Sequence, residues 1–190
     1  MIVRLASAIQ KNSIVDGEGI RAVIWAQGCE HNCQGCHNPE THDMHGGFVV
    51  DLDDIKKELI ELRFCDGVTL SGGDPMFQAE AFCEIAKYAK SLGLNVWCYT
   101  GFEYEKLMQM AKNNIHISEF FKYIDVLVDG KFKIEEKSLN LYFRGSKNQR
   151  IIDVKRSMLL GTVCEVEKYK CEKPVSKYDK SYKEKSGIFC

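Results

Sequence analysis

Short apolar runs alternate with longer amphipathic segments along the chain, and this alternation limits the possible folds more than any other feature. The run IRAVIWAQ at residues 20–27 is almost continuously apolar and ends at Gly28, as in a strand covered on both faces. Asp51 is the expected N-cap of the first helix, and Gly93 is the expected stop of the second. The expected strands cover residues 20–27, 67–71, 95–100, 124–128 and 139–144, and the expected helices cover residues 51–63, 76–92 and 103–113. Short connections between them predict an α/β fold with parallel strands joined by right-handed crossovers.

These units are too few to close an eight-stranded barrel of about 250 residues, so we expect a partial, open parallel (β/α) barrel. In α/β sheets, ligands bind beyond the carboxyl ends of the strands. Polar or glycine-rich loops follow four of the expected strands, at residues 28–38, 71–75, 100–101 and 129–131. The sequence therefore predicts a single rim on which these loops converge.

The composition argues against several classes of protein. The 190 residues carry 26 basic and 27 acidic side chains, a net charge of −1, which does not suit a whole-chain electrostatic grip on nucleic acid or an anionic membrane. No apolar run approaches the roughly 18 residues of a transmembrane helix, and the first residues lack the apolar core of a signal peptide. We therefore expect a cytoplasmic protein with no nucleic-acid or membrane partner.

A domain boundary is expected after residue 155. Residues 1–155 carry the alternating pattern and form the expected core domain, whereas residues 156–190 form a Lys-rich, polar C-terminal tail. We expect this tail to be mobile or to fold on a partner. The pattern gives no role to its three cysteines, which are Cys164, Cys171 and Cys190.

Three of the nine cysteines, Cys29, Cys33 and Cys36, lie within eight residues, which indicates metal binding or catalysis. Soft thiolate ligands select iron–sulfur clusters, Zn²⁺ or Cu(I). Three ligands to a four-iron cube would leave one iron open for catalysis, whereas a structural zinc site would need one further ligand. The candidates for that ligand are His31, His37 and His42. A redox dithiol at Cys33 and Cys36 is a third interpretation.

The segment SGGDP at residues 71–75 directly follows the second expected strand. Gly72 and Gly73 allow a ligand to approach the backbone closely, and Asp74 offers a carboxylate that can accept from an ammonium group. The alternative is a tight strand-to-helix turn with Asp74 as the cap and Pro75 in the first helical position. This motif alone leaves both interpretations open.

The two motifs together resemble the radical S-adenosylmethionine (SAM) superfamily, whose fold is a partial open (β/α) barrel. DGEGIR at residues 16–21 and Cys36-His37-Asn38 resemble the glycyl-radical-enzyme activases within it. DVLVDGKF at residues 125–132 and RGSKNQR at residues 144–150 are similar to segments of the family that activates anaerobic ribonucleoside-triphosphate reductase. The resemblance covers about residues 5–155.

This resemblance implies an enzyme that reductively cleaves SAM at a [4Fe–4S] cluster and generates a glycyl radical on the reductase, its protein substrate. It implies that Cys29, Cys33 and Cys36 are the catalytic cluster ligands. Of the residues implied to bind SAM, Gly35, Cys36 and His37 would line the adenosyl group, and Gly72, Gly73 and Asp74 would hold the methionyl ammonium. The implied electron donor is flavodoxin or ferredoxin.

Two positions depart from the family pattern. Gly35 stands where many superfamily members carry an aromatic residue, so that adenine stacking is lost there, and Glu18 stands where many activases have proline. The alternative functions are activation of another glycyl radical enzyme (pyruvate formate-lyase type), radical SAM chemistry on a small molecule, and a non-catalytic, zinc-stabilised binding module.

Other conspicuous residues are expected to pack or to line the barrel. Residues 144–150 form either a solvated loop or a site for a phosphate or the partner. The residues expected in the core or barrel lining are Cys65, Cys83, Cys98, Trp25, Trp97 and Tyr99.

Overall fold

The computed structural model describes residues 1–62 and 64–174 and confirms the α/β class. The strands are β1 (Ile2–Leu5), β2 (Gln10–Ser13), β3 (Arg21–Ala26), β4 (Phe48–Asp51), β5 (Gly67–Gly72), β6 (Asn95–Tyr99), β7 (Val126–Asp129) and β8 (Arg150–Asp153). The α-helices are α1 (Leu52–Glu61), α2 (Ala79–Ser91), α3 (Tyr104–Ala111), α4 (Ile115–Phe121) and α5 (Val154–Leu160). Short 3₁₀ helices are η1 (Pro39–Thr41), η2 (Pro75–Gln78), η3 (Ile134–Glu136) and η4 (Glu167–Tyr169).

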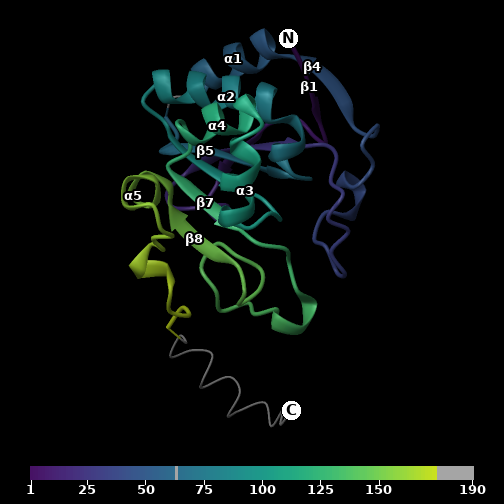
Figure 1. Cartoon of the computed structure of the whole chain (residues 1–190). Coiled ribbons are helices and arrows are strands. Elements are labelled where there is room, and N and C mark those ends of the chain that lie inside the picture. Colours follow the sequence, from purple (N-terminus) through teal and green to yellow (C-terminus); the bar gives the residue numbers. More distant parts are fainter. Residues whose placement is uncertain (63, 175–190) are drawn as a thin grey trace.

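All the strands of this described part belong to one mixed sheet with the order β4-β1-β3-β5-β6-β7-β8, and β2 pairs with β3 beside this path. The neighbours β3, β5, β6 and β7 are parallel, as expected. Antiparallel pairs flank them on both sides, because β1 and β2 pair with β3 and β8 pairs with β7. The parallel strands thus bring their carboxyl ends to one edge of the sheet (Figure 1).

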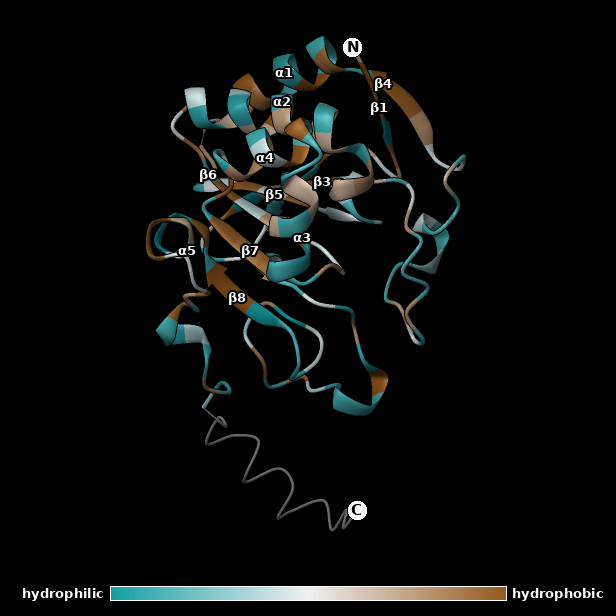
Figure 2. Cartoon of the chain, viewed as in Figure 1, coloured by the Kyte–Doolittle hydropathy of each residue, from teal (hydrophilic) through white to brown (hydrophobic). Residues whose placement is uncertain are grey.

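The central strands are buried on both faces, which explains their nearly continuous apolar sequences. Alternate residues such as Ile24, Leu70 and Cys98 join one hydrophobic cluster with buried side chains of α1–α4, which cover this face (Figure 1). On the other face, Trp97 and Val128 belong to a smaller cluster. In Figure 2, β7 and much of β8 have the brown colour of hydrophobic residues, whereas the segment that connects these two strands is largely hydrophilic.

The sequence signals at the helix ends act as expected. The Asp51 carboxylate caps α1 by accepting from the Asp53 amide at 3.0 Å. Gly93 has a φ of 80° just after α2. The expected helix at 76–92 is divided, since η2 precedes α2. No helix within the described ranges is long and apolar enough to cross a membrane.

The strand expected at 139–144 is wrong. Phe143 has a φ of 45°, which is incompatible with an extended strand, and Leu139 is 86% exposed. Tyr142 and Phe143 of this segment instead join an aromatic cluster, in which the ring centroids of Phe143 and Tyr169 lie 5.2 Å apart. Tyr169 is only 5% exposed, so the chain beyond residue 155 packs on the sheet at least as far as η4.

The expected boundary after residue 155 falls inside α5. Residues 175–190, which include Cys190, lie outside the described residues, so the expectation of a mobile or partner-folded tail remains a prediction for them. Cys65, Cys83, Cys98 and Trp97 are buried, as predicted.

Candidate active site

The loop after β3 carries Cys29, Cys33 and Cys36, each half-buried and none in a disulfide. Two backbone hydrogen bonds fix the start of this cysteine loop, because the amides of Gly28 and Cys29 donate to carbonyl groups of the segment around η1. The Cys36 amide then donates to the Cys33 carbonyl at 3.1 Å, which closes a turn between these two cysteines. The Asn38 amide lies 3.4 Å from the Cys36 Sγ.

Burial favours the protonated form of two thiols of this loop when no metal is bound. It raises the pKa of Cys29 to about 11, and the nearby Asp74 carboxylate adds to the effect. Burial likewise raises the pKa of Cys33. Metal ligation therefore has to displace the protons of these thiols, because a cysteine binds a metal as the thiolate.

The zinc interpretation needs a histidine beside the three thiols, and the structure gives two of the three candidates other contacts. His31 bonds to Asp74, and the His37 ring packs against Phe132 with 4.9 Å between centroids. The buried Nε2 of His42 has no hydrogen-bond partner among the residues that the structure describes. Across residues 1–62 and 64–174, no three His, Cys, Asp or Glu side chains are grouped as they would be around a single metal ion.

Gly72 and Gly73 allow the end of β5 to pack closely on the end of β3. Gly72 has a φ of 105°, and a Cβ at this position would lie 2.6 Å from the backbone nitrogen and oxygen of Ala26. A Cβ on Gly73 would meet the backbone of Gly28. The closest neighbours of both glycines are thus backbone atoms of the segment that leads into the cysteine loop.

The Asp74 side chain is completely buried and accepts hydrogen bonds from several segments. Its Oδ1 accepts from the Met76 amide at 2.9 Å, so Asp74 caps η2, as the turn interpretation predicts. Its Oδ2 is 2.8 Å from Thr100 Oγ1, 3.0 Å from the Gly101 amide and 2.7 Å from His31 Nε2. Both oxygens therefore have partners within the chain.

These contacts confirm that the loops after the parallel strands meet at one rim. His31 comes from the loop after β3, Asp74 follows β5, and Thr100 follows β6. The loop after β7 joins them, because Lys131 Nζ lies 3.4 Å from the His31 carbonyl oxygen.

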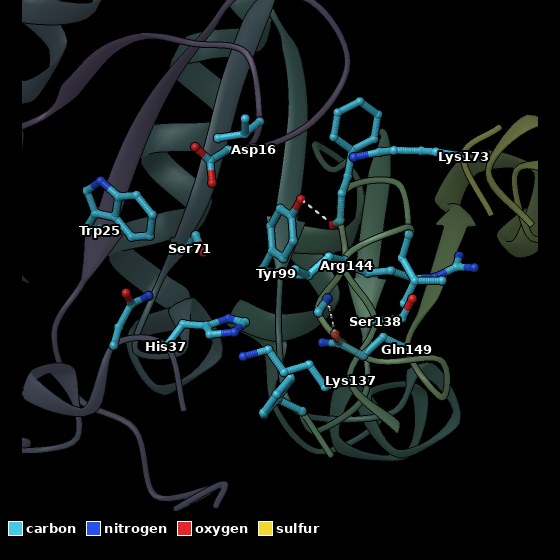
Figure 3. A pocket seen from close by; sticks show the side chains of 17 residues that line it. Asp16, Trp25, His37, Ser71, Tyr99, Lys137, Ser138, Arg144, Gln149 and Lys173 are labelled. Atoms are coloured by element: carbon cyan, nitrogen blue, oxygen red, sulfur yellow. Dashed lines mark hydrogen bonds between the residues drawn. The ribbon is translucent and has the colours of Figure 1, made fainter. Parts of the chain in front are cut away.

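Beside this rim is a cavity of about 390 Å³ on the sheet face opposite α1–α4. Figure 3 shows Trp25, Ser71 and His37 on one side of the cavity and Tyr99 and Gln149 on the other. Tyr99 donates from its hydroxyl to the Phe143 carbonyl at 2.7 Å. The cavity is bounded by the strands, by the end of the cysteine loop and by the segment 137–149. Trp25 and Tyr99 thus line it, as predicted.

The segment 144–150 is anchored within the chain at both of its arginines. Arg150 binds the Asp129 carboxylate at 2.5 Å and the Glu105 carboxylate at 2.7 Å. Arg144 lines the cavity wall, and its Nη2 donates to the Lys170 carbonyl at 3.3 Å. These contacts fix the segment as one wall of the cavity.

Sequence reasoning missed the role of His31 at the rim. It considered this residue only as a zinc ligand. The buried partner, Asp74, lies 43 positions away, and only the crossover from β3 to β5 brings the two together.

Comparisons with known proteins extend these observations. A family model described as a 4Fe-4S single cluster domain matches residues 15–152. The anaerobic ribonucleoside-triphosphate reductase-activating protein of Enterobacteria phage T4 is 32% identical over 143 residues, which cover 72% of this chain and 86% of the relative. The proteins of the same description from Vibrio cholerae and Escherichia coli K12 are each 34% identical, over 73% and 72% of this chain and 90% of each relative.

Proposed function

The chain belongs to the family of anaerobic ribonucleoside-triphosphate reductase-activating proteins, and on this premise we propose that it activates such a reductase. It cleaves SAM reductively at a [4Fe–4S] cluster and generates a glycyl radical on the reductase. One observation carries the proposal. Three thiols without disulfide partners share a loop whose last residues, His37 and Asn38, line a cavity at the carboxyl ends of parallel strands.

The side chains on the loop suit an iron–sulfur cluster. Cys29, Cys33 and Cys36 provide three soft donors on one short loop. We assign these three residues as the cluster ligands, which leaves one iron for SAM. The bound cluster would supply the electron for reductive cleavage of the sulfonium C–S bond of SAM, and this chemistry would provide the radical that takes hydrogen from a glycine of the reductase.

We assign the adenosyl side of SAM to Gly35, Cys36 and His37. His37 is well placed for this role, because its ring lies on the cavity wall beside Phe132. Gly35 has a φ of 72°, a backbone conformation that is strained for any residue with a side chain, and a Cβ there would also lie 2.7 Å from the Ile134 Cδ1. Adenine stacking would therefore come from the cavity wall rather than from position 35.

We assign the methionyl ammonium to the loop of Gly72, Gly73 and Asp74. Because both carboxylate oxygens of Asp74 already accept bonds from the chain, backbone carbonyl groups of this loop are the better acceptors for the ammonium. In this arrangement the Asp74 carboxylate shapes the loop, and the backbone faces SAM.

The remaining assignments follow from this chemistry. We propose that the mixed sheet is the partial open barrel of radical SAM type, with the cavity on its inner face accepting the glycine-bearing loop of the reductase. The electron donor is a flavodoxin or a ferredoxin. The compartment is the cytoplasm, where a reducing environment keeps the cluster thiols free.

The test is anaerobic SAM cleavage by the full chain after reconstitution with iron and sulfide. We expect reductant-dependent 5′-deoxyadenosine from the wild type, and complete loss of both cluster and product in Cys33→Ala. Cys171→Ala is the matched control, because this exposed thiol lies outside the loop and its loss should leave turnover unchanged. Normal turnover by Cys33→Ala, or a wild type that binds one zinc ion and forms no product, would contradict the proposal.

A further inference from the structure

His31 stands between the first two cluster cysteines, yet its side chain turns into the protein. The His31 side chain is 8% exposed and the Asp74 side chain 1% exposed. Its ring centroid lies 5.6 Å from that of Phe77 and 4.5 Å from that of Phe102, the latter in an edge-on arrangement. Two aromatic rings and one carboxylate therefore fix the orientation of the His31 side chain.

The space around this side chain is as restricted as its hydrogen bonding. A Cβ on Gly101 would lie 2.7 Å from the His31 Cγ, so the ring fits only because position 101 has no side chain. The Gly101 amide also donates to the same Asp74 oxygen that binds His31. The end of β6 thus shapes the pocket that receives a residue of the cysteine loop.

A buried carboxylate is stable only when its oxygens are bonded, and a missing donor costs more than an ordinary hydrogen bond contributes. His31 is the donor to Asp74 that comes from the cysteine loop, whereas Thr100 and Gly101 come from the end of β6. The hydrogen bond that His31 donates to Asp74 therefore stabilises the cysteine loop in its observed position.

We propose that His31 and Asp74 are positioning residues that hold the cysteine loop against the ends of β5 and β6, so that its three thiols are placed for the cluster. This inference rests on the proposed function, because it concerns the cluster that Cys29, Cys33 and Cys36 bind. We infer positioning rather than ligation for His31, because its ring is enclosed by Phe77, Phe102 and Asp74, and no group of three metal-ligating side chains occurs among the described residues. Residues that orient metal ligands typically change metal affinity by 10- to 100-fold when they are replaced.

The test is the rate at which a chelator removes iron from the reconstituted, full-length protein, together with the EPR spectrum of the reduced cluster with and without SAM. His31→Leu keeps much of the buried apolar volume but removes the donor, and we expect iron loss about tenfold or more faster, with an altered spectrum. His31→Gln restores an N–H donor near the position of Nε2, and we expect it to recover most of the wild-type rate and spectrum.

Thr100→Val is the matched control. It removes a donor from the same Asp74 oxygen but leaves the bond to the cysteine loop intact, so it should release iron more slowly than His31→Leu at equal stability in urea. Equal iron release from these two variants, or a wild-type rate in His31→Leu, would overturn the positioning role. Complete loss of the cluster in both His31→Leu and His31→Gln, as in Cys33→Ala, would overturn it in favour of ligation. A wild type that takes up no cluster would overturn the proposed function and this inference with it.

Discussion

Two charged side chains are buried at opposite ends of the same group of parallel strands. Arg21 begins β3 and is 1% exposed, and Asp74 follows β5 and is completely buried. At the amino end, the Arg21 guanidinium donates to Thr69 Oγ1 at 2.6 Å and to the Val68 carbonyl at 2.7 Å. It also lies over the Trp97 ring, with 5.4 Å to the centroid.

The partners of the two charges differ in kind. Arg21 bonds mainly to groups within or beside the strands, including the Asn95 carbonyl at the start of β6, so it fastens neighbouring strands together. Asp74 bonds to the loops that follow β3 and β6 and to the start of η2, so it holds the loops of the functional rim together. Burial lowers the pKa of Arg21 to about 10, which leaves it charged at neutral pH. At the amino ends of the strands, buried Arg21 therefore stabilises the fold, whereas at their carboxyl ends buried Asp74 arranges the loops of the site.

The largest effect on stability is expected from Arg21→Met. The substitution leaves several buried carbonyl groups without a donor, and we expect a loss of about 3–5 kcal/mol in the free energy of unfolding, measured in urea. The folded fraction should still bind iron as tightly as the wild type, in contrast to His31→Leu. Arg21→Lys, which keeps the charge and some of the bonds, should lose less. Faster iron release from Arg21→Met than from His31→Leu would contradict the assignment of Arg21 to the fold and of Asp74 to the site.

A smaller effect is expected from Glu105→Gln, which concerns an exposed charge near the same rim. Hydrogen bonds from Arg150 hold the pKa of Glu105 below its ordinary value of 4.5. An exposed pair of this kind contributes about 0.2–1 kcal/mol. Because the folded pKa is lowered, this stabilisation is complete above about pH 4.5 and disappears as the pH falls through the folded value.

The measurement is thermal unfolding of wild type and Glu105→Gln between pH 7 and pH 3. The two melting temperatures should differ slightly at neutral pH and converge at the acid end. A difference in melting temperature that widens as the pH falls would contradict the expected loss of the Glu105–Arg150 pair in acid.

The sequence predicted the parallel centre of the fold well and its edges poorly. The apolar runs of β3, β5 and β6 are unmistakable because both of their faces are buried. β2 (QKNS) is polar, and β8 (RIID) is only four residues long, so neither carries a clear apolar pattern. The helix α4 was missed as well, although Asn114 caps it by accepting from the His116 amide.

The same contrast holds at the site. The spacing of Cys29, Cys33 and Cys36 indicated a metal site or a catalytic centre, because the three cysteines lie close together in the sequence, and the family resemblance added the cluster. The bond from His31 to Asp74 depends on the packing of two strand ends, and local spacing does not encode it. Pro75 and Asp74 did predict the capped turn that β5 leads into.

The most direct test of the proposed activity is low-temperature EPR on an anaerobic mixture of the reduced, cluster-loaded protein, SAM and an anaerobic ribonucleoside-triphosphate reductase, with 5′-deoxyadenosine assayed in the same tube. We predict a glycyl-radical doublet on the reductase and a matching amount of 5′-deoxyadenosine. SAM cleavage without the doublet would contradict the reductase as the substrate, and the absence of both signals from protein that holds its cluster would contradict the activating chemistry itself.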